Sequence, residues 1–206
     1  MQASKDLEMS EGDFQKISAL VYDLSGIHLH DGKKELVKAR LGKRMRSGSF
    51  QSFREYYQHV LEDNTGRELV DLLDAVSTNF TGFFREPKHF EFLKSEFLPR
   101  VTEKKKSRKL RFWSAGCSSG EEPYSIAMTL EEALDRPESW DAKVTATDLS
   151  TRMLSIAASG TYSRERVRTM APELLKRHFL KGVGSRDGQV QVKPRIRQYV
   201  SFQRVN

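Results

Sequence analysis

The stretch FWSAGCSSGEEPYSIAM, residues 112–128, constrains the fold of this chain more than any other feature. It predicts a buried β-strand, a tight turn of small residues and the start of a helix. In an open α/β sheet, this arrangement forms the usual cradle for a nucleotide-like cofactor. The helix would open with Glu121 and Glu122. Loops that bind phosphate keep the helix N-terminus free of carboxylates, because its N–H groups and its dipole hold the phosphate.

The two glutamates narrow the choice of ligand. Two carboxylates would repel a pyrophosphate, but they would accept an ammonium group or hydroxyls. S-adenosylmethionine has no phosphate and carries an ammonium and a sulfonium, so it suits this turn better than NAD or ATP. The expected cofactor is therefore S-adenosylmethionine, with S-adenosylhomocysteine as its product.

A second informative stretch, TNFTGFFRE, occupies residues 78–86. With both stretches present, the chain closely resembles the CheR family, the chemotaxis methyltransferases that methylate glutamates on bacterial chemoreceptors. The signatures of that family are similar to TNxTxFFRE and WSAxxSxGEEPYSIAM, and both occur here almost letter for letter. The resemblance runs from about residue 10 to the last residue and implies a protein-glutamate O-methyltransferase.

The resemblance implies an α/β protein with an N-terminal helical bundle domain. A Rossmann-like methyltransferase domain follows, with a small antiparallel β-subdomain inserted in it. The family continues through more strands and helices than this sequence holds, so we expect the methyltransferase domain to be incomplete. The alternative is a catalytically inactive fragment that binds the cofactor or the receptor. The predicted divisions are 10–86 for the helical domain, 87–109 for a helix and charged linker, and 110–206 for the methyltransferase domain, with the insertion at about 162–198.

Local patterns predict the elements. Capping boxes at Ser10, Ser52 and Thr65 start three helices, each followed by apolar residues at helical spacing. Two more helices are expected at 33–47 and 87–101. In the second half we expect strands at 110–115, 143–147 and 199–205, helices at 121–134 and 151–159, a helical or irregular segment at 162–179, and a hairpin with one arm at 189–192.

Composition restricts the partners and the compartment. Residues 1–101 hold 15 Lys and Arg against 16 Asp and Glu, whereas residues 102–206 hold 20 against 12. A basic half suggests an acidic partner, which charge alone does not identify. No pattern of a nucleic-acid-binding module is present, so no nucleic acid is expected. Without a long apolar run or a leader, the sequence predicts a cytoplasmic protein with no membrane insertion.

By resemblance, six residues contact the cofactor. Arg85 is the candidate catalytic residue, because a guanidinium can grip a carboxylate through two hydrogen bonds. That carboxylate would belong to the methionyl group or to the incoming glutamate. The alternative is a surface arginine that caps the next helix. The expected cofactor-binding residues are Asn79, Thr81, Arg85, Glu122, Asp148 and Asn206.

Two of these roles have a competing interpretation. Asp148 closes the second strand, where an acid commonly binds ribose hydroxyls. It could instead cap the next helix, a role that Ser150 could also fill. Glu122 is expected to face cationic or hydroxyl groups of the cofactor, while Glu121 could simply favour the helix dipole.

The chemistry needs few groups. A glutamate titrates near ~4.3 and is already ionised at neutral pH, so no general base is required. We expect no metal site, since the pair His28 and His30 lacks further ligands nearby. Cys117 is interpreted as a small loop-lining residue and not as a nucleophile.

The expected partner is the cytoplasmic domain of a chemoreceptor. Lys33, Arg40 and Arg44 would form one row on a helix, with Lys43 beside it. The row is either solvated charge or a surface that meets the acidic methylation helices of the receptor. The inserted β-subdomain resembles versions that dock a short C-terminal receptor peptide by adding it as a strand.

Overall fold

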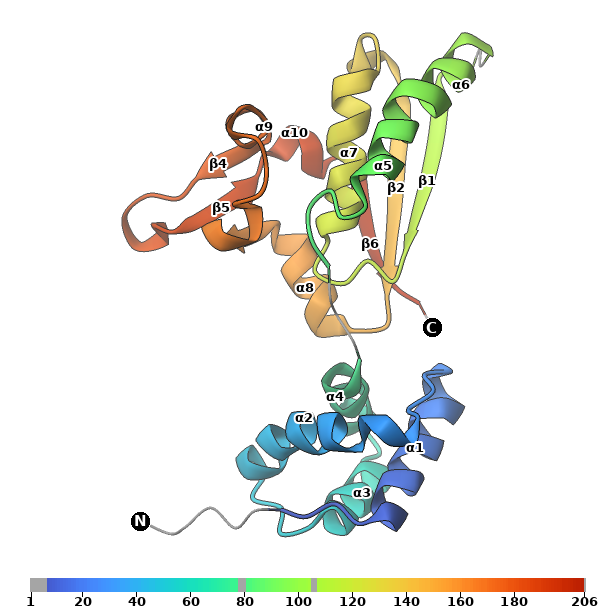
Figure 1. Ribbon diagram of the computed structural model, residues 1–206, viewed down its shortest axis with the longest axis vertical. Helices are drawn as coiled ribbons and strands as arrows, with labels where there is room; N and C mark the ends of the chain where they lie inside the picture. Colours follow the sequence, from blue (N-terminus) through green and yellow to red (C-terminus); the bar gives the residue numbers. More distant parts are fainter. Residues whose placement is uncertain (1–6, 78–80, 105–106, 206) are drawn as a thin grey trace. The chain divides into compact units, whose positions relative to one another are not determined.

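The computed structural model describes residues 7–77, 81–104 and 107–205, and its contacts divide the chain into two compact units. Of the described residues, 7–77 belong to the first unit, and 81–104 and 107–205 belong to the second (Figure 1). Each unit has its own buried apolar residues, so each is described by itself.

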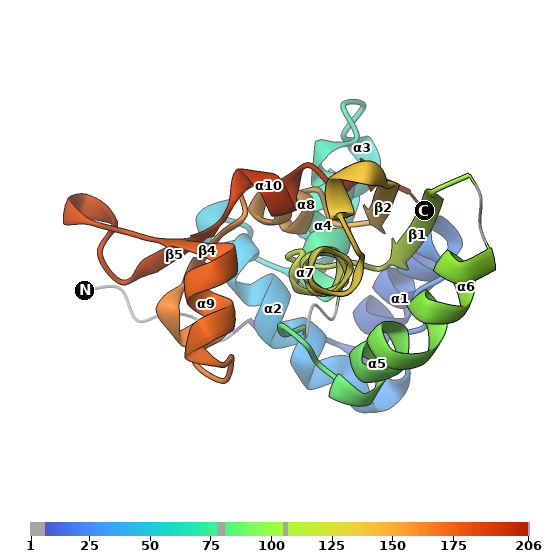
Figure 2. The same ribbon diagram turned by 90° about the horizontal axis from the view of Figure 1, so that it is seen from above.

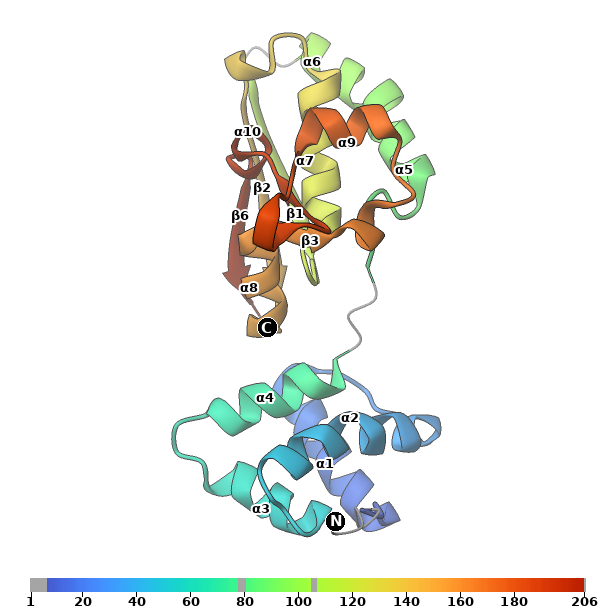
Figure 3. The same ribbon diagram turned by 90° about the vertical axis from the view of Figure 1, so that its left-hand side faces the viewer.

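The first unit is a bundle of α-helices (Figure 3). The predicted helical periodicity is largely confirmed, because the buried residues of each helix recur at helical spacing, although the predicted apolar position Leu61 is exposed. Its largest fully buried side chains include Phe14, Ile17, Leu41, Tyr56 and Leu72. The helices are α1 (Glu11–Ser25), α2 (Lys34–Ser47), α3 (Phe53–Glu62) and α4 (Arg67–Val76), with a short 3₁₀ turn at Asp31–Lys33 before α2.

The starts of these helices match the predicted capping boxes to different degrees. At Ser10 the box is complete, since the hydroxyl accepts from the N–H of Asp13 and the Asp13 carboxylate accepts from the N–H of Ser10. At Ser52 only half of it forms, because Glu55 accepts from the N–H of Gln51 instead.

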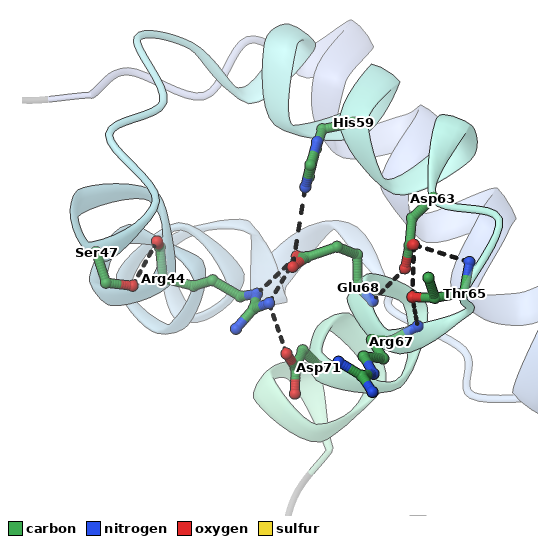
Figure 4. Close-up of polar contacts among 8 residues, drawn as sticks. All are labelled: Arg44, Ser47, His59, Asp63, Thr65, Arg67, Glu68 and Asp71. Atoms are coloured by element: carbon green, nitrogen blue, oxygen red, sulfur yellow. Dashed lines mark hydrogen bonds and ion pairs between the residues drawn. The ribbon is translucent and has the colours of Figure 1, made fainter.

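The box predicted at Thr65 is wrong. Helix α4 begins after Gly66, which adopts φ 70°, and Asp63 supplies the carboxylate that accepts from the N–H groups of Thr65 and Glu68 (Figure 4). A hydrogen bond from the Thr65 hydroxyl, together with these backbone donors, lowers the pKa of Asp63 to about 2.

Two arginines of the predicted basic row, Arg40 and Arg44, make contacts inside the helical bundle. Arg44 contacts Glu68 at 2.6 Å and Asp71 at 2.5 Å, both on α4 (Figure 4). Arg40 donates to the backbone oxygens of Val76 and Ser77 at 2.7 and 2.9 Å. Arg44 therefore holds α2 to the first half of α4 and Arg40 holds it to the end of α4, which corrects their interpretation as solvated charge.

In the part of the chain that the structure describes, the second unit is built on a parallel sheet of three strands (Figure 1). The strand order β1-β2-β6 follows the chain order, as expected for the start of this fold. Helix α7 (Glu121–Ala133) packs on all three strands, and α8 (Thr151–Ser159) packs on β2 and β6. The strands are β1 (Lys109–Ala115), β2 (Asp141–Asp148) and β6 (Val200–Arg204), with a 3₁₀ turn at Pro137–Ser139 before β2.

The helix predicted at 87–101 is present and contains one irregularity. It consists of α5 (Pro87–Phe92), a π-helical turn at Leu93–Phe97 and α6 (Leu98–Lys104). This helical segment lies beside α7 (Figure 2). A π-helical turn inside a helix is rare and often marks a functional site.

A small antiparallel sheet projects from the parallel one, with the strand order β3-β5-β4 (Figures 1 and 2). Its strands are β3 (Thr161–Ser163), β4 (Phe179–Lys181) and β5 (Gln189–Val192). The predicted arm at 189–192 is confirmed, whereas β3 lies in the segment expected to be helical or irregular. The insertion also contains 3₁₀ turns at Arg164–Val167 and Gly184–Arg186 and the helices α9 (Pro172–His178) and α10 (Pro194–Arg197), joined by turns and irregular segments.

Strand β1 forms one edge of the parallel sheet. Among the described residues it pairs with β2 alone, through Lys109↔Asp141 to Ala115↔Thr147. Its Trp113 is 68% exposed, and the indole N–H donates to Thr147 Oγ1 at 3.0 Å. A free edge carries backbone groups that are open to pairing with another strand.

We expect Arg44→Met to destabilise the helical unit by about 1–3 kcal/mol, because hydrogen bonds to charged partners are lost and Glu68 is left partly buried without its cation. Arg46→Met is the matched control, since Arg46 lies exposed on the same helix. Hydrogen exchange of the amides in α2 and α4 measures the difference. Equal protection in the two variants would show that the Arg44 contacts do not stabilise the bundle.

Candidate functional site

A pocket of about 420 Å³ lies beside the start of α7 in the second unit. It brings together three of the predicted cofactor residues, namely Thr81, Arg85 and Glu122. Polar groups therefore converge on a cavity whose other walls are largely apolar, which is the usual character of a small-molecule site. The remaining lining residues are Gly82, Glu86, His89, Phe90, Leu93, Phe112, Gly116 and Ile126.

The loop between β1 and α7 is held by backbone contacts at the carboxyl ends of two strands. The N–H of Cys117 donates to the carbonyl of Thr147 on β2 at 2.8 Å. Gly120 adopts φ 94°, and a Cβ built there would lie 2.8 Å from the Cβ of Ala157. Only glycine provides both this conformation and this close approach between α7 and α8.

The two glutamates at the start of α7 have opposite environments. Glu122 is exposed, lines the pocket and accepts a hydrogen bond from the Ser114 hydroxyl at 2.6 Å. Glu121 is fully buried, accepts from the Ser119 hydroxyl at 2.7 Å and lies 3.0 Å from Arg166 Nη1. Glu121 thus does more than favour the helix dipole, because a buried carboxylate requires a counter-charge.

Asp148 joins the ends of β1 and β2. One carboxylate oxygen accepts from the N–H of Ser118 at 2.7 Å, and the other accepts from the N–H of Ser150 at 2.8 Å. The hydroxyl of Ser150 caps α8 by accepting from the N–H of Met153. The capping interpretation of Asp148 is therefore wrong. Its carboxylate lies at the carboxyl edge of the sheet and contacts the loop between β1 and α7.

Arg85 lies in a strained turn before α5. Its N–H donates to the carbonyl of Gly82, and its neighbours Phe84 and Glu86 both have positive φ, at 52° and 55°. Such conformations are uncommon for residues other than glycine and are typical of functional sites. Glu86, and not Arg85, occupies the N-cap position of α5. The turn is attached to α7 by a hydrogen bond from the N–H of Phe84 to the Ser125 hydroxyl at 2.9 Å.

Two predicted site residues, Asn79 and Asn206, lie outside the described residues. Their roles stay predictions. In the ranges 7–77, 81–104 and 107–205, no group of three or more His, Cys, Asp and Glu side chains could hold a metal ion.

Cys117 is buried in the loop, and its burial raises the pKa of the thiol to about 12. The thiol therefore stays protonated at neutral pH, as an inert loop-lining residue would.

Two contacts from the inserted segment to the loop were missed by the sequence analysis. Arg166 pairs with Glu121, and the Tyr162 hydroxyl donates to the carbonyl of Ser119 at 2.7 Å. Both residues are more than 40 positions from their partners. Nothing in local spacing signals such a pairing.

None of the helices in the described part of the chain combines the length and the apolar character that crossing a membrane requires.

Comparisons with known proteins agree with this geometry. Residues 12–77 match the all-alpha domain of CheR methyltransferases, and residues 79–206 match their SAM-binding domain. The chain is 38% identical to a chemotaxis protein methyltransferase of Borreliella burgdorferi, over 98% of this chain and 71% of that protein. It is 38% identical to the chemotaxis protein methyltransferase of Escherichia coli K12, over 100% and 70%. For chemotaxis protein methyltransferase 2 of Pseudomonas aeruginosa, the identity is 40% over 98% and 70%.

Proposed function

This chain belongs to the CheR family of methyltransferases, and we propose that it transfers a methyl group from S-adenosylmethionine to glutamate side chains of a bacterial chemoreceptor. The observation that carries the proposal is the pocket in which Thr81, Arg85 and Glu122 meet at the start of α7. A location in the cytoplasm follows from this substrate, and cell fractionation that finds the protein elsewhere would contradict it.

The residues around the pocket fit S-adenosylmethionine chemically. Glu122 offers a carboxylate to a cationic or hydroxyl group, and the Arg85 guanidinium offers two parallel hydrogen bonds to a carboxylate. Apolar side chains such as Phe90, Leu93 and Ile126 supply the walls between them. In this proposal Asp148, at the end of β2, accepts hydrogen bonds from ribose hydroxyls, as an acid at that position commonly does. When bound, S-adenosylmethionine supplies an activated methyl group.

The residues of this chain contribute mainly by positioning. The acceptor glutamate is already an anion at neutral pH, so the site needs no group to remove a proton. Holding two reactants in line contributes on the order of 7–11 kcal/mol to lowering a barrier. In this proposal Arg85 and Glu122 fix the orientation, and the strained turn around Arg85 keeps the guanidinium at the pocket wall.

A second candidate function is binding without turnover. The edge strand β1 and the exposed Trp113 favour it, because an open strand edge beside an exposed aromatic side chain can pair with a further strand. Methyl transfer to receptor cytoplasmic domain by the purified 206-residue monomer would exclude this alternative. Binding of S-adenosylhomocysteine without transfer would support it.

Two surfaces are candidates for contact with the receptor. On the helical unit, the candidate surface is the basic cluster of Lys33, directly before α2, and Lys43, within α2. Arg40 and Arg44 are not included, because their side chains contact α4 and the residue after it. On the small sheet, β4 is an edge strand with exposed Leu180, next to a cavity of about 220 Å³. An edge strand of this kind can accept a peptide as an added strand.

The cofactor assignment predicts that the chain binds S-adenosylhomocysteine and not NAD, because a phosphate is repelled by the Glu122 carboxylate, which lines the pocket at the start of α7. Glu122→Gln is expected to weaken S-adenosylhomocysteine binding by about tenfold, the effect of one charge-assisted hydrogen bond. Glu138→Gln, on an exposed turn far along the sequence from the loop, is the control. Calorimetry that finds tight NAD binding and no S-adenosylhomocysteine binding would refute the assignment.

For Arg85→Ala we expect a loss of S-adenosylhomocysteine affinity of about tenfold or more and no methyl transfer, because alanine cannot replace a bidentate charged contact. Arg100→Ala is the matched control, since Arg100 is exposed and pairs with exposed Glu96 one helical turn before it. Thermal midpoints show whether the fold is intact. Unchanged affinity and transfer in a stable Arg85→Ala protein would show that Arg85 is structural.

Reversing charge on the helical unit tests the receptor surface. The double variant Lys33→Glu with Lys43→Glu should bind a receptor cytoplasmic fragment more weakly while its S-adenosylhomocysteine affinity stays unchanged, because both residues belong to the first unit. Arg54→Glu, exposed on α3, is the control. Equal receptor binding by all three proteins would leave the cluster as solvated charge.

Equal binding of receptor fragments with and without their C-terminal residues would contradict docking on β4.

A further inference from the structure

The buried carboxylate of Glu121 depends on a residue from the inserted segment. Glu121 is 0% exposed, and one of its oxygens lies 3.0 Å from Arg166 Nη1. Its other oxygen accepts from the Ser119 hydroxyl at 2.7 Å. A carboxylate removed from water is strongly unfavourable without a counter-charge, so Arg166 compensates a charge at the base of the cofactor loop.

The same guanidinium nitrogen reaches a third segment. Arg166 Nη1 donates to the backbone oxygen of Thr81 at 3.4 Å. Arg166 itself lies in the 3₁₀ turn Arg164–Val167, directly after β3. It therefore bridges the inserted segment, the turn before α5 and the start of α7.

Tyr162 makes two further contacts between the inserted segment and the same two parts of the chain. The Tyr162 hydroxyl donates to the carbonyl of Ser119 at 2.7 Å, and the Tyr162 ring packs edge-on against Phe83 with centroids 5.0 Å apart. The inserted segment thus contacts both the loop before α7 and the turn that contains Arg85. The turn supplies Thr81 and Arg85 to the pocket, and the loop leads into the start of α7, which supplies Glu122.

Arg166 is distant in sequence from the pocket walls but contacts residues that form or adjoin them, without lining the pocket itself. Its contact Thr81 is a lining residue, and its partner Glu121 directly precedes the lining residue Glu122. We propose that Arg166 is a positioning residue that holds Thr81 and Glu122 in place for the cofactor, so that the inserted segment sets cofactor affinity. The proposal rests on the proposed function and adds a residue to it.

A purely stabilising ion pair is the competing explanation, and a double-mutant design separates the two. Arg166→Met leaves Glu121 buried without its cation, so it is expected to lower the thermal midpoint. Adding Glu121→Gln removes the unpaired charge and should return the midpoint towards the wild type. Neither change restores the bridge to Thr81. Arg168→Met is the matched control, because Arg168 follows the same turn and pairs with exposed Glu165 at 2.9 Å.

The measurements are S-adenosylhomocysteine affinity by calorimetry and hydrogen exchange of the ligand-free protein. We expect Arg166→Met to lose about tenfold in affinity, which corresponds to about 1.4 kcal/mol. We also expect faster exchange in residues 82–84 and 118–122. Both effects should persist in the double variant after its midpoint has recovered.

Two results would overturn the proposal. One is an Arg166→Met protein that matches Arg168→Met in both affinity and exchange. The other is a double variant whose affinity and exchange recover together with its thermal midpoint. If the wild type does not bind S-adenosylhomocysteine, the proposed function fails, and the exchange of residues 82–84 and 118–122 still decides whether Arg166 positions the two segments.

Discussion

The close approach of α7 and α8 at Gly120 is the constraint on which the rest of the site depends. A Cβ at this position would lie 2.8 Å from the Cβ and 3.1 Å from the Cα of Ala157, and the backbone has φ 94°. The neighbouring Tyr124 hydroxyl donates to the carbonyl of Ala157 at 2.8 Å, which fixes the same contact from the side of α7. Any side chain at residue 120 would separate the two helices and turn the start of α7.

Given that contact, the geometry of a helix places two adjacent glutamates in different surroundings. Successive residues in an α-helix point about 100° apart, so neighbours at a helix start face different surroundings. Here Glu121 turns into the protein and meets Arg166, while Glu122 turns to the pocket and meets Ser114. Of these two glutamates, Glu121 therefore stabilises the contact between α7 and the inserted segment, and Glu122 is available to a ligand.

The sequence was sufficient where a signal is local and repeated. Periodic apolar residues predicted α1, α2 and α3, and the small-residue loop predicted the strand, turn and helix around the pocket. It failed where several local partners compete, as at α4, where Asp63 takes the donors assigned to Thr65. Strand β3 was missed because three residues are too few to show alternation.

The candidate site was predicted in the same uneven way. Thr81, Arg85 and Glu122 meet in one pocket, and Asp148 stands at the sheet edge beside its loop. The role of Arg166 was not predicted, because its partner Glu121 is 45 residues away in the sequence and no periodic pattern links residues that far apart. Arg40 and Arg44 share a helical row by spacing, but spacing does not reveal that α4 supplies acceptors for both.

Trp113 gives this chain an optical probe of its own sheet edge. The indole is 68% exposed on β1, so its emission should lie at the long wavelengths of a hydrated tryptophan. Trp140, the other tryptophan of the chain, directly precedes β2 and is less exposed. A blue shift of the Trp113 emission would therefore register any polypeptide that covers the face around β1, without a label and before any chemistry is assayed.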